Sequence, residues 1–315
     1  MRLSIIIEAA ILIIFLISVP IVIIMEHNNA ISSEAKTNEN AVTYLQKGDQ
    51  FYKQMKFSDA SVQYWEAVKH DSNLAEAHFR LAEIYYGNLW NYEALNELNE
   101  LEKINPKYPE LYLMMGKIYD RMADPNKSFE AFQRSLVLEP NNSETHYYLG
   151  TIYQQRNAKE EAIKEYESAV TDITPSSDKE SIVKSYLQLG RIYKIDKDLA
   201  KAIDMLKKAL AIDPKSVDVI SELTVVYSQQ AGIYKSEKKF DEAAKIYEEI
   251  VKLDPNNLEN VEYYMELGSI YRSQQLYDKA IATYTAIAKL DPLNFDAFAA
   301  LKELNLIKSS GENNP

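Results

Sequence analysis

The side chains of this chain that could perform chemistry are few and poorly spaced for it. Four histidines are present, and no two of them lie at the i, i+4 spacing at which a helix presents a pair of metal ligands. They are His27, His70, His78 and His146. The absence of cysteine removes disulfides, thiol nucleophiles, iron–sulfur clusters and thiolate zinc sites. The sequence therefore predicts no metal site.

Signatures of catalysis or of cofactor binding are equally absent from the sequence. No GxSxG, HExxH or paired-carboxylate signature occurs, and none of the eight glycines falls in a phosphate-cradling pattern such as GxxxxGK or GxGxxG. Adjacent carboxylates such as Glu160 and Glu161 are typical of a solvated helix face. We expect no cofactor, no small-molecule substrate and no enzymatic activity; an enzyme with an unrecognised site is the distant alternative.

Composition narrows the classes of partner. The 315 residues include 47 acids and 35 bases, which give a formal net charge of −12. A nucleic-acid binder needs a basic face to meet phosphates, so this charge argues against nucleic acid as a partner. The same charge argues against docking of the polar part of the chain on anionic lipid, which would repel it.

The amino-terminal segment 5–25 is long and apolar enough to cross a bilayer. Its 21 residues, IIIEAAILIIFLISVPIVIIM, would rise about 31 Å as a helix, against a hydrocarbon core of about 30 Å. Glu8 lies one turn inside the edge, where it can snorkel, and Pro20 is tolerated in a membrane helix. The apolar run exceeds the h-region of a signal peptide and no A-x-A-like site follows it. We therefore expect an uncleaved transmembrane anchor, residues 1–25, rather than a cleaved signal peptide.

Charges around the anchor predict its orientation. Arg2 precedes the apolar segment and Glu26 and Glu34 follow it, which favours a cytoplasmic amino terminus and an extracytoplasmic body. Residues 26–40 are polar without an apolar period and are interpreted as a linker. Glu8, an acid early in an apolar helix, resembles the type IV pilin signature, although the glycine before a pilin cleavage site is missing.

The remainder of the chain repeats one pattern. Copies of Tyr-x-x-(Met or Leu)-Gly-x-x-Tyr begin at Tyr112, Tyr186 and Tyr264, and each is followed downstream by a small residue and then by an acidic residue and proline. This pattern resembles the tetratricopeptide repeat, a helix–turn–helix of about 34 residues. The resemblance covers residues 41–294. It implies an all-α fold, a superhelical solenoid whose repeats bury their apolar faces on one another.

Seven repeats can be placed, and a capping helix follows them. The repeats are 41–74, 75–108, 109–142, 143–176, 183–216, 224–257 and 261–294, with a cap at 295–308 that completes a solenoid of residues 41–308. Residues 309–315 are expected to form a frayed tail. Small residues at repeat positions 8 and 20 and tyrosine at position 11 are expected to be core residues, not functional ones.

Insertions interrupt the repeat pattern. Residues 177–182 are expected to enlarge a connection, and 258–260 form a short insertion. The inserted residues 217–223, VDVISEL, predict one long helix over about 217–237 that projects about 10 Å beyond its neighbours, either as a tolerated insertion or as a partner-docking fin. Trp90, in a tight turn, either packs on the adjacent turn or anchors a partner.

The resemblance also implies a binding surface, because in this family the inner face is lined by helix-A positions 2, 5, 9, 12 and 13. Position 5 predicts an apolar floor, and the charged positions predict a gradient from acidic in the early repeats, where Glu76 and Glu110 lie, to basic in the later ones, with Arg121, Lys184, Lys235 and Arg272. The candidate groove residues are Leu45, Asp49, Tyr52, Phe79, Glu83, Tyr86, Leu113, Lys117, Tyr147, Leu187, Arg191 and Lys194.

The function implied is that of a membrane-anchored scaffold that binds peptide segments or partner helices in this groove, with residues 5–25 in the lipid bilayer. The alternative is a subunit or assembly factor of a pilus- or secretion-type envelope machine. The Hsp70/Hsp90 clamp of this family is disfavoured because Leu45 and Asp49 stand where its lysine and asparagine are expected. The membrane-anchored lipopolysaccharide-assembly regulators end in a cysteine-ligated module, which this chain lacks.

Overall fold

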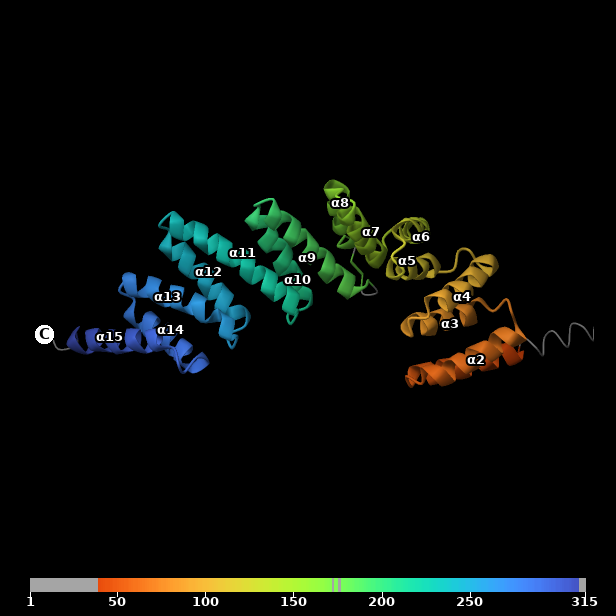
Figure 1. The fold of residues 1–315 in the computed structure, drawn as a ribbon, viewed down its shortest axis with the longest axis horizontal. Coiled ribbons are helices and arrows are strands. Elements are labelled where there is room, and N and C mark those ends of the chain that lie inside the picture. The colour runs from red at the N-terminus through yellow and green to blue at the C-terminus, as the bar shows by residue number, and fades with distance from the viewer. Residues whose placement is uncertain (1–38, 172, 175–176, 312–315) are drawn as a thin grey trace, which may run out of the picture. The chain divides into compact units, whose positions relative to one another are not determined.

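The computed structural model describes residues 39–171, 173–174 and 177–311, and no strand occurs among them. They divide between two compact units, Met1–Pro140 and Asn141–Pro315. Within each unit, successive helices pack as antiparallel hairpins, so the all-α helical-repeat fold is confirmed (Figure 1). The predicted membrane anchor, 5–25, lies outside the described residues. None of the helices within the described ranges is long and apolar enough to cross a bilayer.

The first unit contains five labelled helices after the helical residues 39–53. They are α2 (Phe57–His70), α3 (Ala75–Gly87), α4 (Asn91–Ile104), α5 (Leu111–Arg121) and α6 (Pro125–Leu138). The second unit comprises α7 (Ser143–Gln155), α8 (Lys159–Ala169), α9 (Lys179–Ile195), α10 (Leu199–Ile212), α11 (Val217–Ser236), α12 (Phe240–Leu253), the 3₁₀ turn η1 (Leu258–Asn260), α13 (Val261–Ser273), α14 (Tyr277–Leu290) and α15 (Phe295–Gly311).

One turn geometry joins the two helices of each hairpin. Repeat position 15 adopts a left-handed backbone with φ between 56° and 63°, at Met55, Leu89, Ala123, Asn157, Lys197, Lys238 and Gln275. The next amide then donates to the carbonyl of position 11, as from Trp90 N to Tyr85 O at 2.9 Å. This six-residue closure ends the first helix of the hairpin and reverses the chain in the way of a Schellman motif.

The core of each unit depends on close approach of the two helices of a hairpin. A Cβ added to Gly116 would lie 2.5 Å from Cε1 of Phe132, so only glycine permits this packing. In the second unit Tyr166 is fully buried over Gly150, where an added Cβ would lie 2.6 Å from its ring. In these two hairpins, repeat positions 8 and 24 pack as a glycine against a large ring.

The structure differs from the sequence prediction at two inserted segments and at the carboxy-terminal cap. The segment 177–182 was predicted to enlarge a connection, but α9 already begins at Lys179 because Asp178 accepts a hydrogen bond from Ser181 N at 2.8 Å and Ile182 is buried. The long helix predicted over 217–237 is present as α11. It does not stand free, because Val219 and Leu223 lie in the core of the second unit.

The carboxy-terminal cap is also longer than predicted. Helix α15 continues to Gly311, three residues beyond the expected end of the cap. The hydroxyls of Ser309 and Ser310 donate to the carbonyls of Leu306 and Ile307 at 3.0 and 2.9 Å, so these serines continue the helix instead of fraying.

Candidate protein-binding surface

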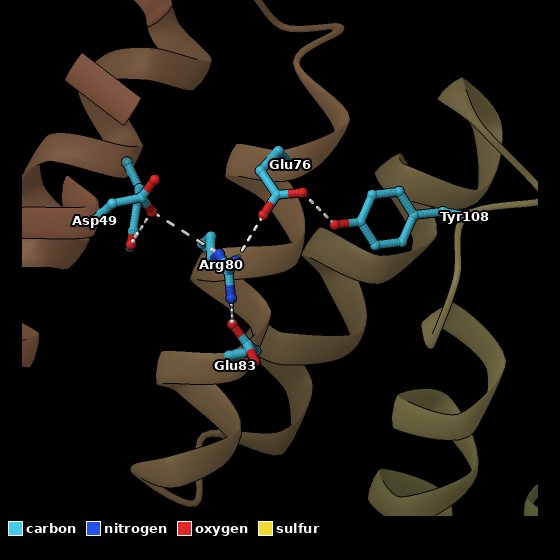
Figure 2. Close-up of polar contacts among 6 residues, drawn as sticks. Asp49, Glu76, Arg80, Glu83 and Tyr108 are labelled. Atoms are coloured by element: carbon cyan, nitrogen blue, oxygen red, sulfur yellow. Dashed lines mark hydrogen bonds and ion pairs between the residues drawn. The ribbon is translucent and has the colours of Figure 1, made fainter. Parts of the chain in front are cut away.

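A cluster of charged and phenolic side chains is centred on the first helices of the first two hairpins, with Tyr64 added from α2 and Tyr108 from the connection between α4 and α5. We call it the Arg80 cluster: Asp49, Tyr64, Glu76, Arg80, Glu83 and Tyr108 (Figure 2). Glu76, Arg80 and Glu83 follow one another at i, i+4 and i+7 on α3, so they share one face of that helix. The guanidinium of Arg80 lies at the centre of the cluster.

Arg80 reaches three carboxylates. Its Nη2 lies 2.9 Å from Glu76 Oε1 and its Nη1 lies 2.8 Å from Glu83 Oε2. Its Nε faces Asp49 Oδ1 at 3.9 Å, which is within ion-pair range but too far for a hydrogen bond, and this buried atom has no hydrogen-bond partner. The three carboxylates exceed the single guanidinium in charge, and each keeps 21–39% of its side-chain surface exposed.

Two tyrosines donate hydrogen bonds to carboxylates of this cluster. Tyr64 OH donates to Asp49 Oδ1 at 2.9 Å, and Tyr108 OH donates to Glu76. Burial and these hydrogen bonds raise the pKa of both phenols well above the ordinary value, so both remain proton donors. Burial lowers the pKa of Arg80, but the hydrogen bond and charge of Glu83, with the charge of Glu76, outweigh it and raise that pKa. The two phenols thus stay protonated as donors and Arg80 stays charged.

Aromatic candidates flank the Arg80 cluster. The half-buried ring of Tyr52 lies 6.0 Å from the Arg80 guanidinium, and burial, with the charge of Glu83, raises the pKa of its phenol. The ring of Tyr86 is covered by the Arg121 guanidinium at 3.5 Å and approached by Lys117 Nζ at 5.7 Å. The sequence grouped Tyr52 and Tyr86 as equivalent groove residues, but a cation already stacks closely on Tyr86.

The predicted apolar floor is only partly available. Phe79, Leu113 and Leu187 are 2%, 7% and 6% exposed, so these position-5 side chains belong to the core and do not form an open floor. Leu45 and Tyr147 are half-buried and pack against core clusters of their own units. The groove pattern fails at these positions because an apolar side chain at the junction of stacked hairpins is buried by the neighbouring repeat.

The predicted basic residues of the second unit are paired with acids. Arg191 Nε donates to Glu222 Oε2 at 3.1 Å, and Lys194 donates to the other oxygen of the same carboxylate. The same relation links Lys235 to Glu266 at 2.6 Å and Arg272 to Glu303 at 2.7 Å. Each base lies on the first helix of one hairpin and each acid on the first helix of the next. The basic end of the predicted gradient is therefore a ladder of ion pairs between repeats.

Glu222 is the most buried acid of this ladder. Burial raises the pKa of Glu222, but the hydrogen bonds from Lys194 and Arg191 outweigh it and hold the pKa of this carboxyl below its usual value. Charge reversal at Arg191 or Lys194 would therefore face Glu222 with a second carboxylate and weaken the fold, so it is no clean test of partner binding.

A cavity of about 510 Å³ opens beside α9 in the second unit. Val183, Lys184 and Leu187 line it from α9, and Ile212, Ser216 and Asp218 line it from the end of α10 to the start of α11. Although Leu187 is nearly buried, its remaining surface faces this cavity. Another predicted groove residue of the second unit, Lys194, lines a separate cavity of about 380 Å³ between α9 and α11.

Two residues that organise these surfaces were not among the sequence candidates. Arg80 lies outside the inner positions of the family pattern, although its spacing from Glu76 and Glu83 was a readable signal of a charged helix face. Glu222 lies in the inserted segment 217–223, which carried no repeat position to assign it by. Its pairing depends on contact between helices 28–31 residues apart.

Histidines of the described residues serve structure. His78 Nδ1 lies 2.7 Å from Glu97 Oε2, and His146 Nδ1 lies 2.7 Å from Glu165 Oε2, at equivalent positions of the second and fourth repeats. Within the described ranges no group of three or more His, Asp or Glu residues is placed to hold a metal ion. These pairs join the two helices of their hairpins.

Comparison with known proteins identifies the repeats. Family models described as the tetratricopeptide repeat match residues 109–142, 141–215 and 234–295. Among solved structures, the C-terminal part of a TPR repeat-containing protein from Cytophaga hutchinsonii matches with a TM-score of 0.58 and 18% identity, over 82% of this chain and 99% of that one. At this identity the likeness shows the fold alone.

Curated relatives are much longer than the match. The BBSome complex member BBS4 homolog of Drosophila melanogaster is 28% identical over 174 residues, which cover 53% of this chain and 35% of that protein. The protein O-mannosyl-transferase TMTC1 of Homo sapiens is 24% identical over 196 residues, which cover 62% of this chain and 20% of that protein. The chain thus spans only a minor part of either relative.

Proposed function

We propose that this chain, whose repeats are tetratricopeptide repeats, is a membrane-anchored scaffold that holds a segment of a partner protein on the first helices of its hairpins. Repeats of this kind mediate protein–protein interaction, and one relative is itself named as a member of a complex. Residues 5–25 are the proposed anchor, with the amino terminus cytoplasmic and the repeats extracytoplasmic. The proposal includes no bond chemistry.

The Arg80 cluster is the observation that carries the proposal. Its three carboxylates outnumber its guanidinium, and their exposed oxygens keep capacity to accept further hydrogen bonds. The partner segment that complements this surface is an extended peptide with lysine or arginine side chains, which would pair with Asp49 and Glu83. The half-buried ring of Tyr52 beside them offers a face for a cation or an aromatic side chain.

The experiment places a photocrosslinking amino acid at Tyr52 in the full chain in intact membranes. A second variant carries the same amino acid at Glu130, an exposed position on α6 of the same unit, as a matched control. Captured proteins are identified from both, and capture is repeated with Asp49→Asn/Glu83→Gln in the background. Glu130→Gln serves as the control for loss of a negative charge.

A genuine partner is captured from Tyr52 and not from Glu130. Each carboxylate replacement should weaken its binding about tenfold, because charge-assisted hydrogen bonds contribute about 1.5–3 kcal/mol each. Binding should also weaken with added salt. Capture that is unchanged in the Asp49→Asn/Glu83→Gln variant would place the partner elsewhere and sink this assignment.

A further inference from the structure

Two neighbouring turns of the first unit hold large apolar side chains in solvent. We call these residues the apolar turn edge: Met55, Phe57, Leu89, Trp90 and Tyr92, whose exposed fractions are 76%, 41%, 69%, 55% and 72%. They lie in the turns that join the helical residues 39–53 to α2 and α3 to α4. Scattered exposed apolar residues need no explanation, but five in two neighbouring turns do.

The two turns lie at the same end of the unit. The helices of each hairpin are antiparallel and the hairpins are stacked, so 39–53 and α3 run in the same direction and end side by side (Figure 1). Ring contacts hold part of the edge in place, since Phe57 packs on Tyr52 with ring centroids 5.2 Å apart and Trp90 packs on Tyr85 at 5.8 Å. The edge is thus ordered, although most of its surface stays outside the core.

The repeat architecture does not require an apolar residue at the left-handed position of the turn. Met55 and Leu89 occupy the left-handed position of the turn, which costs an ordinary L-residue about 1 kcal/mol and which asparagine tolerates better. The equivalent residue of the third turn of the same unit is Ala123, followed by Asp124. In the second unit the position is taken by Asn157 and by polar residues after it. Exposed Met and Leu at a strained position therefore indicate contact with something outside the described chain.

We infer that the apolar turn edge lies in the interfacial layer of a zwitterionic bilayer, an inference that rests on the membrane anchor of the proposed function. Tryptophan and tyrosine prefer this layer because their rings are apolar at one end and polar at the other. Residues 53–58 and 87–92 contain no carboxylate and two lysines, Lys53 and Lys56, within a chain of net charge −12. Carboxylates return only at Asp59 and Glu93, one residue further along each helix.

The length of chain before the first described helix permits this contact. The apolar segment ends at residue 25, and 13 residues, 26–38, separate it from residue 39. Such a connection spans at most about 43 Å, whereas the 15 helical residues 39–53 rise about 22 Å. The tether therefore reaches past the whole helix, and the edge can fold back onto the surface that holds the anchor. The edge also lies in the two repeats that follow the tether in the sequence.

The two tryptophans of the chain make a direct test possible. Trp90 belongs to the edge, whereas Trp65, which is similarly exposed, lies eight residues into α2, about 12 Å from the turn. The full chain is reconstituted into phosphatidylcholine vesicles whose acyl chains are brominated near the headgroup. Trp65→Phe leaves Trp90 as the only reporter, and Trp90→Phe leaves Trp65. Flotation of the vesicles measures insertion of the anchor separately.

Trp90 emission should fall about twofold with brominated lipid while Trp65 emission is unchanged, because an interfacial indole sits at headgroup level. In a Met55→Asn/Leu89→Asn variant the quenching of Trp90 should be lost without loss of thermal stability, since asparagine suits the left-handed turn. Flotation with no quenching of Trp90 overturns the inference and leaves the anchor standing. Trp90 that is shielded from aqueous iodide yet unquenched by lipid overturns it in favour of a protein partner or a second copy. Failure to float removes the anchor and this inference together.

Discussion

At the scale of the residue, the pairing of buried His78 with Glu97 determines the charge state of the histidine. His78 is buried, and its ring joins Glu97 on one side and the carbonyl of Ser72, 3.1 Å away, on the other. Burial lowers the pKa of His78, but the hydrogen bond to Glu97, with further help from Ser72, outweighs burial and raises that pKa above its ordinary value. The charged imidazolium is therefore the form that the fold favours.

This pairing predicts a pH dependence of stability. Because the folded-state pKa of His78 exceeds the unfolded-state value, the pair stabilises the fold fully below about pH 6.5 and loses that contribution as pH rises through the folded-state pKa. The free energy of unfolding of the full chain should fall as the pH rises from about 6 to about 8.5. Denaturant unfolding at both pH values measures it.

The control for this prediction is a second histidine. His78→Gln should flatten the pH dependence, whereas His70→Gln, which removes a ring that stacks on Tyr44, should leave it in place. A His78→Gln protein that keeps the full pH dependence of the native chain would show that other groups cause it.

At the scale of the element, four hairpins are packed through a contact between a glycine and a ring, at Gly48, Gly116, Gly150 and Gly268. Gly116 on α5 meets Phe132 on α6, and Ser128 Oγ also donates to the Gly116 carbonyl at 3.0 Å. Gly232, on α11, has no atom within 4 Å of an added Cβ. A side chain would therefore clash at Gly116 but not at Gly232, and one alanine substitution at each glycine tests this difference.

Alanine substitution should change the stability of the protein in opposite directions at the two glycines. Gly116→Ala should destabilise the protein by about 1–3 kcal/mol, because its methyl group overlaps the Phe132 ring and forces the hairpin apart. Gly232→Ala should stabilise it by about 0.5–1 kcal/mol, because alanine favours a helix interior and meets nothing. Thermal unfolding followed by circular dichroism compares both with the native chain. Equal effects of the two substitutions would contradict the packing described here.

At the scale of the whole molecule, the chain is strongly acidic, but many of its charged side chains form ion pairs that join one repeat to the next. The net charge is −12, yet four predicted groove bases of the second unit are paired with Glu222, Glu266 and Glu303 of the next hairpin or of the cap, and Lys184 is paired with Glu180 of its own helix. The first unit differs, because its Arg80 cluster has more carboxylates than cations. We therefore propose that selection of a partner by charge belongs to the first unit, which also follows the proposed anchor in the sequence.

The proposed topology has its own measurable consequence. In sealed vesicles with the cytoplasmic face outward, the repeats should resist added protease until detergent opens the vesicles, because the positive-inside bias places them in the lumen. A tag fused before Met1 should be digested in the same vesicles and serves as the control. Digestion of the repeats in sealed vesicles would reverse the proposed orientation.

The sequence alone determined the class of fold and the register of its hairpins. The glycines, alanines and tyrosines at fixed repeat positions pack within one hairpin. Because these short-range contacts recur from repeat to repeat, they can be predicted from the sequence pattern. Even the long helix α11 was predictable, because seven inserted residues keep an apolar face nearly in phase. The apolar anchor, too, is a matter of local composition, and it remains a prediction.

Only the tertiary structure decided which candidate side chains are available. Phe79 and Leu187 match the groove pattern but are buried, since the neighbouring repeat covers them. Arg80 and Glu222, which organise the charged surfaces, are joined to partners across stacked helices up to 31 residues away. The reach of a long charged side chain from one helix to the next depends on how the helices stack. A sequence pattern that describes single repeats therefore does not predict which side chains of neighbouring repeats will pair.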